Sequence, residues 1–153
     1  MDEKQFKYNQ YLNPIANCPP SECLERERDA FRWVHSHPTA DDFVPIPLMQ
    51  MVDRRPIDTT DLNQPCDAFS LSLWNTREKA IAKLSAAISN RPPDARAQYI
   101  EDKGGSVACI RLKPNHGVAS EPNKKGHFSL FEYVGVELYT EIIEIVNIFG
   151  PNG

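Results

Sequence analysis

The chain has 153 residues, which is enough for one domain with its own hydrophobic core. Hydrophobic residues make up 41% and charged residues 25%, close to the average of globular proteins, so this composition excludes a disordered or fibrous chain. The net charge of −4 argues against nucleic acid as the main partner, and no apolar run approaches the ~18 residues of a membrane span.

The sequence also carries no visible secretory signal, so we expect a soluble, cytoplasmic protein. In that compartment cysteines stay reduced, and we expect free thiols at all four of them, Cys18, Cys23, Cys66 and Cys109.

The first segments are rich in proline and in charge. Residues 1–21 hold three prolines and few large apolar groups, which predicts an irregular N-terminal arm before a single domain over 22–150. The stretch "SECLERERDA" has a capping residue in Ser21 and strong helix formers, which favours a short helix over 22–30. The next residues, "FRWVH", predict a strand that places Phe31, Trp33 and His35 on one face.

A long connection follows this strand. Five prolines between residues 38 and 66 rule out a long helix or a central strand there, so we expect an extended, proline-rich connection over 38–66. The alternation in "DAFSLSLW" then predicts a second strand. Apolar residues at helical spacing predict the main helix over about 76–90, which is capped by Asn75 or Thr76 and ends before Pro92.

The last third of the chain predicts strands at 106–112 and 128–134, joined by a polar loop. Residues 137–149 fit either a helix or a strand, and their β-branched residues lead us to favour a single turn at 137–140 before a strand at 142–148. This order of elements indicates an α+β domain with one mixed or mainly antiparallel sheet packed against one main helix.

The segment "VHSHPT" resembles the motif of the JAMM zinc metalloproteases, in which two histidines of a His-Ser/Thr-His-Pro segment are zinc ligands. The matching ligands here are His35 and His37. The family's next two motif positions fall on Pro45 and Leu48, which cannot bind zinc or take a proton from water. A structural zinc site joining these histidines to Cys18 and Cys23 is a further alternative, although its spacing is atypical.

The order of strands is similar in layout to ADP-ribosyltransferase-type folds, in which an early Arg or His, a middle Ser or Tyr and a late Glu surround a nicotinamide nucleotide. The resemblance implies site residues that we name from each of these three places in the chain: Arg32 or His35, Ser70 or Ser72, and Glu132, Glu141 or Glu144.

Three functions therefore stay open. We rank first a non-catalytic protein that binds a protein partner or itself, through the proline-rich connection and the apolar strand at 142–148. A nucleotide-handling enzyme of the transferase layout ranks second, and a metal-dependent hydrolase that uses His35 and His37 ranks third. For the leading function we expect no cofactor.

Overall fold

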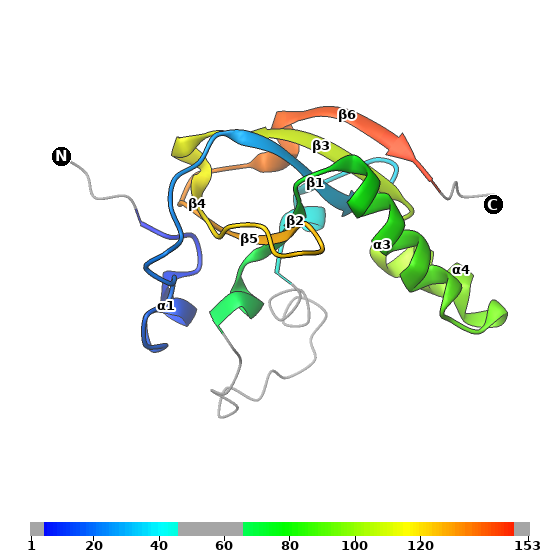
Figure 1. Cartoon of the computed structure of the whole chain (residues 1–153), viewed down its shortest axis with the longest axis horizontal. Helices are drawn as coiled ribbons and strands as arrows, with labels where there is room; N and C mark the ends of the chain where they lie inside the picture. The colour runs from blue at the N-terminus through cyan, green and yellow to red at the C-terminus, as the bar shows by residue number, and fades with distance from the viewer. Residues whose placement is uncertain (1–4, 46–65, 149–153) are drawn as a thin grey trace.

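Six strands form one antiparallel sheet in the computed structural model, which describes residues 5–45 and 66–148 (Figure 1). The order across the sheet is β4-β5-β2-β1-β3-β6. The strands are β1 (Arg28–Val34), β2 (Leu71–Trp74), β3 (Ser106–Leu112), β4 (Gly117–Ala119), β5 (His127–Glu132) and β6 (Ile142–Asn147). The α-helices are α1 (Asn9–Leu12), α3 (Arg77–Ser89) and α4 (Pro93–Lys103). Short 3₁₀ helices are η1 (Ala40–Phe43), η2 (Cys66–Phe69), η3 (Pro114–His116) and η4 (Leu138–Glu141). The predicted α+β class is therefore confirmed.

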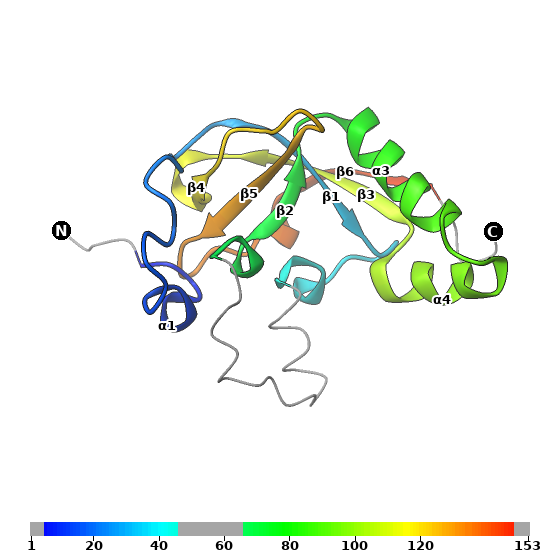
Figure 2. The ribbon, with the colours of Figure 1, turned by 60° about the horizontal axis from the view of Figure 1, so that its bottom comes forward.

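Strand β1 lies inside the sheet and fixes the direction of its side chains. It pairs with β3 along its whole length and with β2 where Phe31 lies opposite Trp74. Successive side chains of a strand point to opposite faces, so Phe31 and Trp33 share one face while Arg32 lies on the other. Figure 2 shows that the sheet is strongly twisted, with β5 and β2 crossing the direction of β3 and β6.

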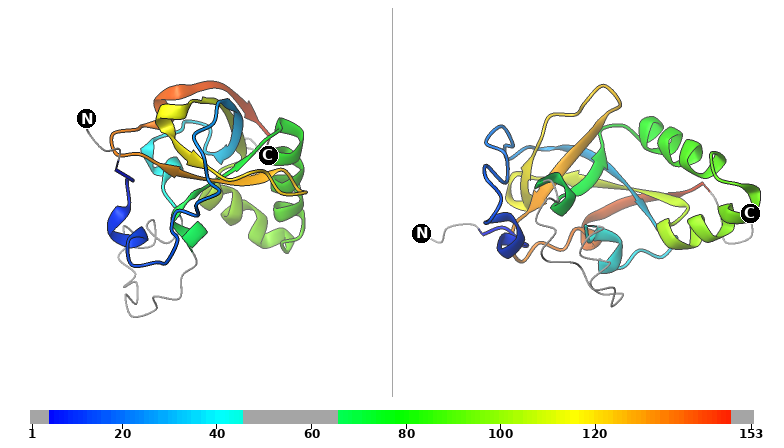
Figure 3. Two further views of the ribbon diagram at one scale, coloured as in Figure 1. Left: turned by 60° about the vertical axis from the view of Figure 1, so that its left-hand side comes forward. Right: turned by 90° about the horizontal axis from the view of Figure 1, so that it is seen from below.

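Each face of the sheet has its own core. One core is built from alternate residues of β1 to β5 and is closed by Phe43 of η1 and Leu138 of η4. The other packs Phe31, Trp74 and Val107 against the apolar residues of α3, which are Ala80, Leu84 and Ile88. Helices α3 and α4 lie together at one end of the molecule, and α1 lies at the other (Figures 1 and 3).

Helix α3 lies where the main helix was predicted, and its N-cap is Thr76, whose hydroxyl accepts a hydrogen bond from the Lys79 N–H at 3.2 Å. The prediction of a single main helix is not confirmed. A second helix of similar length, α4, was not predicted, because Pro92 and Pro93 indicated only an end to helical structure. Pro93 is in fact the first residue of α4, a position where the missing N–H of proline has no consequence.

The predicted helix over 22–30 is wrong. Residues before β1 are extended, and Leu24 forms an isolated bridge with Ala119 of β4. The physical reason is that a helix here would have no apolar face, since Cys23 and Leu24 are the only apolar residues between Ser21 and Ala30. An extended chain instead pairs the whole of β1 with β3.

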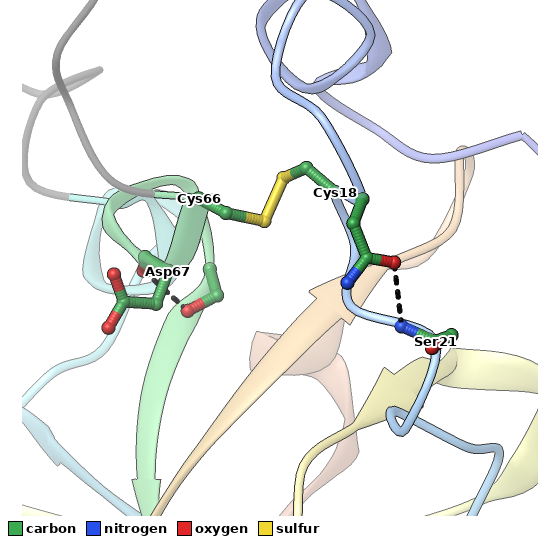
Figure 4. The surroundings of a disulfide bond; sticks show 6 residues. Cys18, Ser21, Cys66 and Asp67 are labelled. Carbon is green, nitrogen blue, oxygen red and sulfur yellow. Dashed lines mark hydrogen bonds between the residues drawn. A yellow bond between two sulfur atoms is a disulfide. The ribbon is translucent and has the colours of Figure 1, made fainter.

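The expectation of four reduced cysteines is also wrong. Cys18 and Cys66 form a disulfide, and their Cα atoms are 5.6 Å apart (Figure 4). The bond joins the segment before β1 to the start of η2, across a sequence separation of 48 residues. Cys23 and Cys109 are free thiols. Cytoplasmic location stays a prediction, but the four reduced thiols expected from it are not found.

Residues 46–65, most of the predicted proline-rich connection, lie outside the described residues, as do residues 1–4 and 149–153. The described ends of the connection form the 3₁₀ helices η1 and η2. The boundary between an arm and a domain at residue 21 stays a prediction. Within the described ranges, every helix is too short or too polar to cross a membrane.

Candidate functional site

The turn after β1 is organised by the carboxylate of Asp42. Its Oδ1 accepts a hydrogen bond from the His35 N–H at 3.1 Å, and its Oδ2 accepts one from the Thr39 N–H at 2.9 Å. Thr39 in turn caps η1 by accepting a hydrogen bond from the Asp41 N–H at 3.2 Å. This set of bonds fixes the chain reversal between β1 and η1 and therefore fixes the backbone carbonyl of Asp42.

The ring of His35 completes the same turn. Its Nδ1 lies against Asp42 Oδ1, and its Nε2 lies 2.8 Å from the carbonyl oxygen of Glu101 in α4. Both partners are acceptors, so the doubly protonated imidazolium satisfies both. Burial lowers the pKa of His35, but these two hydrogen bonds and the charges of Asp42 and Asp102 outweigh it, so the pKa is raised above its ordinary value.

Arg32 is the side chain that this turn positions. Its Nε donates to the Asp42 carbonyl at 2.7 Å, and one terminal nitrogen donates to the Ser72 carbonyl of β2 at 2.9 Å. The guanidinium also lies over the ring of Phe43, 5.6 Å from its centre. Among the described residues, none of the ion pairs involves Arg32. The guanidinium, which is half-buried, is thus held in a fixed plane by two carbonyl oxygens. Its remaining N–H donors stay available for another group.

Burial is the largest influence on this cation. It lowers the pKa of Arg32 to about 10, against the opposing effect of the negative charges of Glu132 and Asp42 and of Tyr8. An arginine that loses solvation without gaining a paired carboxylate is a favourable place for an anion.

Glu132 ends β5 and is almost completely buried, with 3% of its surface exposed. Its Oε2 pairs with the Lys7 ammonium at 3.2 Å. Its Oε1 is buried and has no hydrogen-bond partner among the described residues. Burial raises the pKa of Glu132, and the cationic groups of Lys7 and Arg32 oppose this rise. A buried carboxylate oxygen without a donor is costly, so it calls for an explanation.

The charges of Glu132 and Arg32 both act on the phenol of Tyr8. Burial and then the negative charge of Glu132 raise the pKa of Tyr8 to about 12, and Arg32 partly opposes them. Neither Tyr8 nor Lys7 was predicted as a site residue. The sequence offered no signal for them, since the pairing of this segment with the end of β5 depends on contacts across 125 residues.

Arg32 and Glu132 share one face of the sheet, and no ion pair joins them. In β1, Phe31 and Trp33 face α3, so Arg32 between them faces the opposite side of the sheet. In β5, Phe131 packs with Leu12 and Cys23, so the next residue, Glu132, faces the opposite side. Both side chains therefore point toward the face whose core is closed by Phe43 and Leu138. Their strands are separated by β2, so each charge acts on the pKa of the other without an ion pair.

The serines of the expected site do not join them through their hydroxyl groups. Ser70 Oγ donates to the Asp67 carbonyl at 2.6 Å and stabilises η2. Ser72 is exposed, and the alternation of β2 places its side chain opposite the buried Leu71 and Leu73. Only the backbone carbonyl of Ser72 contacts Arg32.

The other late glutamates lie elsewhere. Glu144 of β6 forms an ion pair with Arg77 of α3 at 2.8 Å. Glu141 lies 3.9 Å from the ring of His116. Of the three glutamates named from the sequence, Glu132 is the one whose charge affects Arg32.

The two histidines of the third-ranked function, His35 and His37, follow the end of β1. Both ring nitrogens of His35 already have protein partners, and His37 is exposed. The alternative zinc site with Cys18 and Cys23 is excluded, because Cys18 is bonded to Cys66. Within the described ranges, no group of three or more His, Cys, Asp and Glu side chains could hold a metal ion.

Comparison with known proteins adds no family to this geometry. No protein-family model, curated protein or solved structure matches the chain.

Proposed function

We propose that the protein binds a phosphate-bearing nucleotide through Arg32. The proposal rests on how the guanidinium of Arg32 is held. Two backbone carbonyls fix it in place, and no carboxylate of the described residues pairs with it. A planar guanidinium with free donors matches the oxygens of a phosphate group better than an ammonium does.

The class of nucleotide is inferred from Arg32 together with Glu132. The ADP-ribosyltransferase-type layout expected from the sequence needs an early Arg beside a middle strand and a Glu on a late strand. Arg32 lies on β1 beside β2, and Glu132 lies on β5, which supports the proposal. A nicotinamide dinucleotide offers phosphates to Arg32 and ribose hydroxyls to a carboxylate. Oε1 of Glu132 has no hydrogen-bond partner among the residues that the structure describes, and it is an acceptor suited to such a hydroxyl. A transferase or glycohydrolase acting on this substrate is the proposed activity.

The proposal is tested by titrating the protein with NAD, ADP-ribose and adenosine in a calorimeter. We expect the two ligands with phosphates to bind and adenosine to bind more weakly. Arg32→Gln removes the charged donors, which should weaken ADP-ribose binding about 10- to 100-fold. The matched control is Arg111→Gln, because Arg111 is an exposed arginine of β3 that pairs with Asp29. Equal ADP-ribose affinity in wild-type protein and Arg32→Gln would contradict the proposal.

Arg32→Gln also removes two hydrogen bonds to carbonyls, so its fold must be checked by urea unfolding. Arg32→Lys serves as a second variant, since it keeps the charge but cannot bind a phosphate through two parallel hydrogen bonds. We expect it to bind ADP-ribose more weakly than wild-type protein does.

A second candidate function is self-association through β6. This strand is the last in the sheet order, and Ile143 on it is 65% exposed. An edge strand presents backbone groups that can pair with another strand, and exposed apolar side chains add contact area. We propose that β6 of one molecule pairs with β6 of a second copy.

Sedimentation at increasing concentration tests this second candidate. Ile143→Lys places a charge on the edge and should shift the protein to the monomer. Leu24→Lys is the matched control, because Leu24 is similarly exposed but lies away from β6. A wild-type protein that remains monomeric at every concentration would contradict self-association.

A further inference from the structure

The first described residues lie across the end of β5 and cover Glu132. The Lys7 N–H donates to the Glu132 carbonyl at 2.9 Å, and the Val134 N–H donates to the Gln5 carbonyl at 2.7 Å. The Lys7 ammonium pairs with Glu132 Oε2 and donates to the Val136 carbonyl. The ring of Phe6 contacts that of Tyr133, with centroids 5.4 Å apart. These contacts bind one oxygen of the carboxylate, Oε2, and bury the group that the proposed nucleotide needs.

The same segment then packs on the outside of the sheet. Leu12 of α1 is buried in a cluster with Cys23 and Phe131. Tyr11 stacks on Phe69 of η2, with ring centroids 5.5 Å apart. We call residues 5–23 the cover segment, since it extends from Glu132 to the first residue that bridges to β4, Leu24.

Two attachments hold the cover segment to the rest of the molecule. At its end, Leu24 exchanges two backbone hydrogen bonds with Ala119, at 3.0 and 2.8 Å. Within it, the Cys18–Cys66 disulfide ties the segment to η2 (Figure 4). When the noncovalent contacts of the cover segment break, the disulfide still keeps the segment close to the surface on which it packs. This high effective concentration favours the closed state.

From this arrangement we infer that the cover segment is a redox-controlled cover of Glu132, held closed by the Cys18–Cys66 disulfide and released when that bond is reduced. The inference rests on the proposed nucleotide site and names its regulation. The reductant is a dithiol, which gives two electrons and two protons to the bond and becomes a disulfide itself, while Cys18 and Cys66 become thiols. The protein is then closed in oxidising surroundings and open in reducing ones.

The free thiol of Cys23 does not reduce the disulfide. Cys23 is buried beside Cys18 and Cys66, and burial raises the pKa of its thiol. A protonated thiol is a poor nucleophile toward a disulfide. Opening therefore depends on an external reductant.

Amide hydrogen exchange of the full chain tests the inference directly. After treatment with dithiothreitol, the amides of Lys7 and Val134 should exchange faster by about tenfold or more, because their hydrogen bonds exist only in the closed state. The amides of Leu24 and Ala119 lie beyond the cover segment and should not change. Unchanged exchange at Lys7 and Val134, or equal acceleration at all four amides, would overturn the inference.

Variants separate the disulfide from other effects of the reductant. The double variant Cys18→Ser, Cys66→Ser should show fast exchange at Lys7 and Val134 with and without dithiothreitol. The control Cys109→Ser changes a free thiol of β3 and should respond to dithiothreitol as wild-type protein does. A double variant that keeps slow exchange at Lys7 and Val134 would overturn the role of the bond.

ADP-ribose titration of the oxidised and reduced protein separates this inference from the proposed function. We expect tighter binding after reduction. Equal affinity in both forms, with the cover segment open in the reduced one, would overturn its role as a cover. Opening seen by exchange without binding in either form would overturn the nucleotide proposal, while the redox control of the segment would stand.

Discussion

At the scale of single residues, Asp42 connects three parts of the chain. Its carboxylate binds His35 and the Thr39 N–H, and its carbonyl holds the guanidinium of Arg32. The pair of histidines that suggested a metal site is thus part of a turn, and one of them acts on Arg32 through Asp42. His35 is a positioning residue in this account.

A pH dependence follows from the raised pKa of His35. Its folded-state pKa lies above the unfolded value of about 6.5, so its contribution to stability is complete below that pH and is lost as the pH rises through the folded-state pKa. His35→Gln should therefore lower the free energy of unfolding more at about pH 5.5 than at about pH 8.5. Urea unfolding at both values measures the difference.

The control for this comparison is His37→Gln, which changes an exposed histidine two residues away. It should alter the free energy of unfolding little at either pH. A loss in His35→Gln that is equal at both values would contradict the charged pairing with Asp42.

Residue-level prediction from the sequence was partial for a physical reason. Arg32 and Glu132 were named because a resemblance placed them on suitable strands, and the alternation of the strands puts them on one face. The partners of His35 were not predictable, because Asp42 is brought back by a turn and Glu101 lies on α4, 66 residues away. Lys7 and Tyr8 depend on the still longer contact with β5.

At the scale of elements, local signals determined α3 well and α4 poorly. Thr76, the apolar spacing and the following prolines all indicated the first helix. The charged helix α4 has no fully buried residue, so it shows no apolar periodicity to predict it. The extended chain before β1 was mistaken for a helix because its charged residues have high helix propensity, which pairing with β3 and β4 overrides.

The cap of α3 gives a direct test at this scale. Thr76→Ala removes the acceptor for the Lys79 N–H and should lower the free energy of unfolding by about 1 kcal/mol. Ser89→Ala, at the exposed last residue of α3, is the matched control and should change stability little. Chemical denaturation measures both, and equal losses would contradict the capping role of Thr76.

At the scale of the whole molecule, the disulfide is the feature that the sequence did not predict. Four cysteines allow several pairings, and the missing secretory signal favoured reduced thiols. The pairing became apparent only when the segment before β1 was placed against η2. In the inference above, this disulfide holds the cover segment closed in oxidising surroundings and releases it in reducing ones. The bond therefore bears on function as well as on stability.

Thiol titration of the denatured protein checks the pairing. Without reductant, only Cys23 and Cys109 should react, and after reduction all four cysteines should react. Removing the bond with Cys18→Ser and Cys66→Ser should lower the free energy of unfolding by at most about 4 kcal/mol, the entropy estimate for a loop of this length. Four reactive thiols in the protein purified without reductant would contradict the assignment.

A double comparison in reduced protein tests whether Arg32 binds the phosphates of a nucleotide. ADP-ribose and adenosine are titrated into wild-type protein and into Arg32→Gln. If Arg32 contacts the phosphates, removing them from the ligand and removing the guanidinium from the protein act on one interaction, so the two losses do not add. We predict that Arg32→Gln weakens ADP-ribose binding about 10- to 100-fold and leaves adenosine binding unchanged. Equal weakening of both ligands, or no weakening of either, would contradict the account.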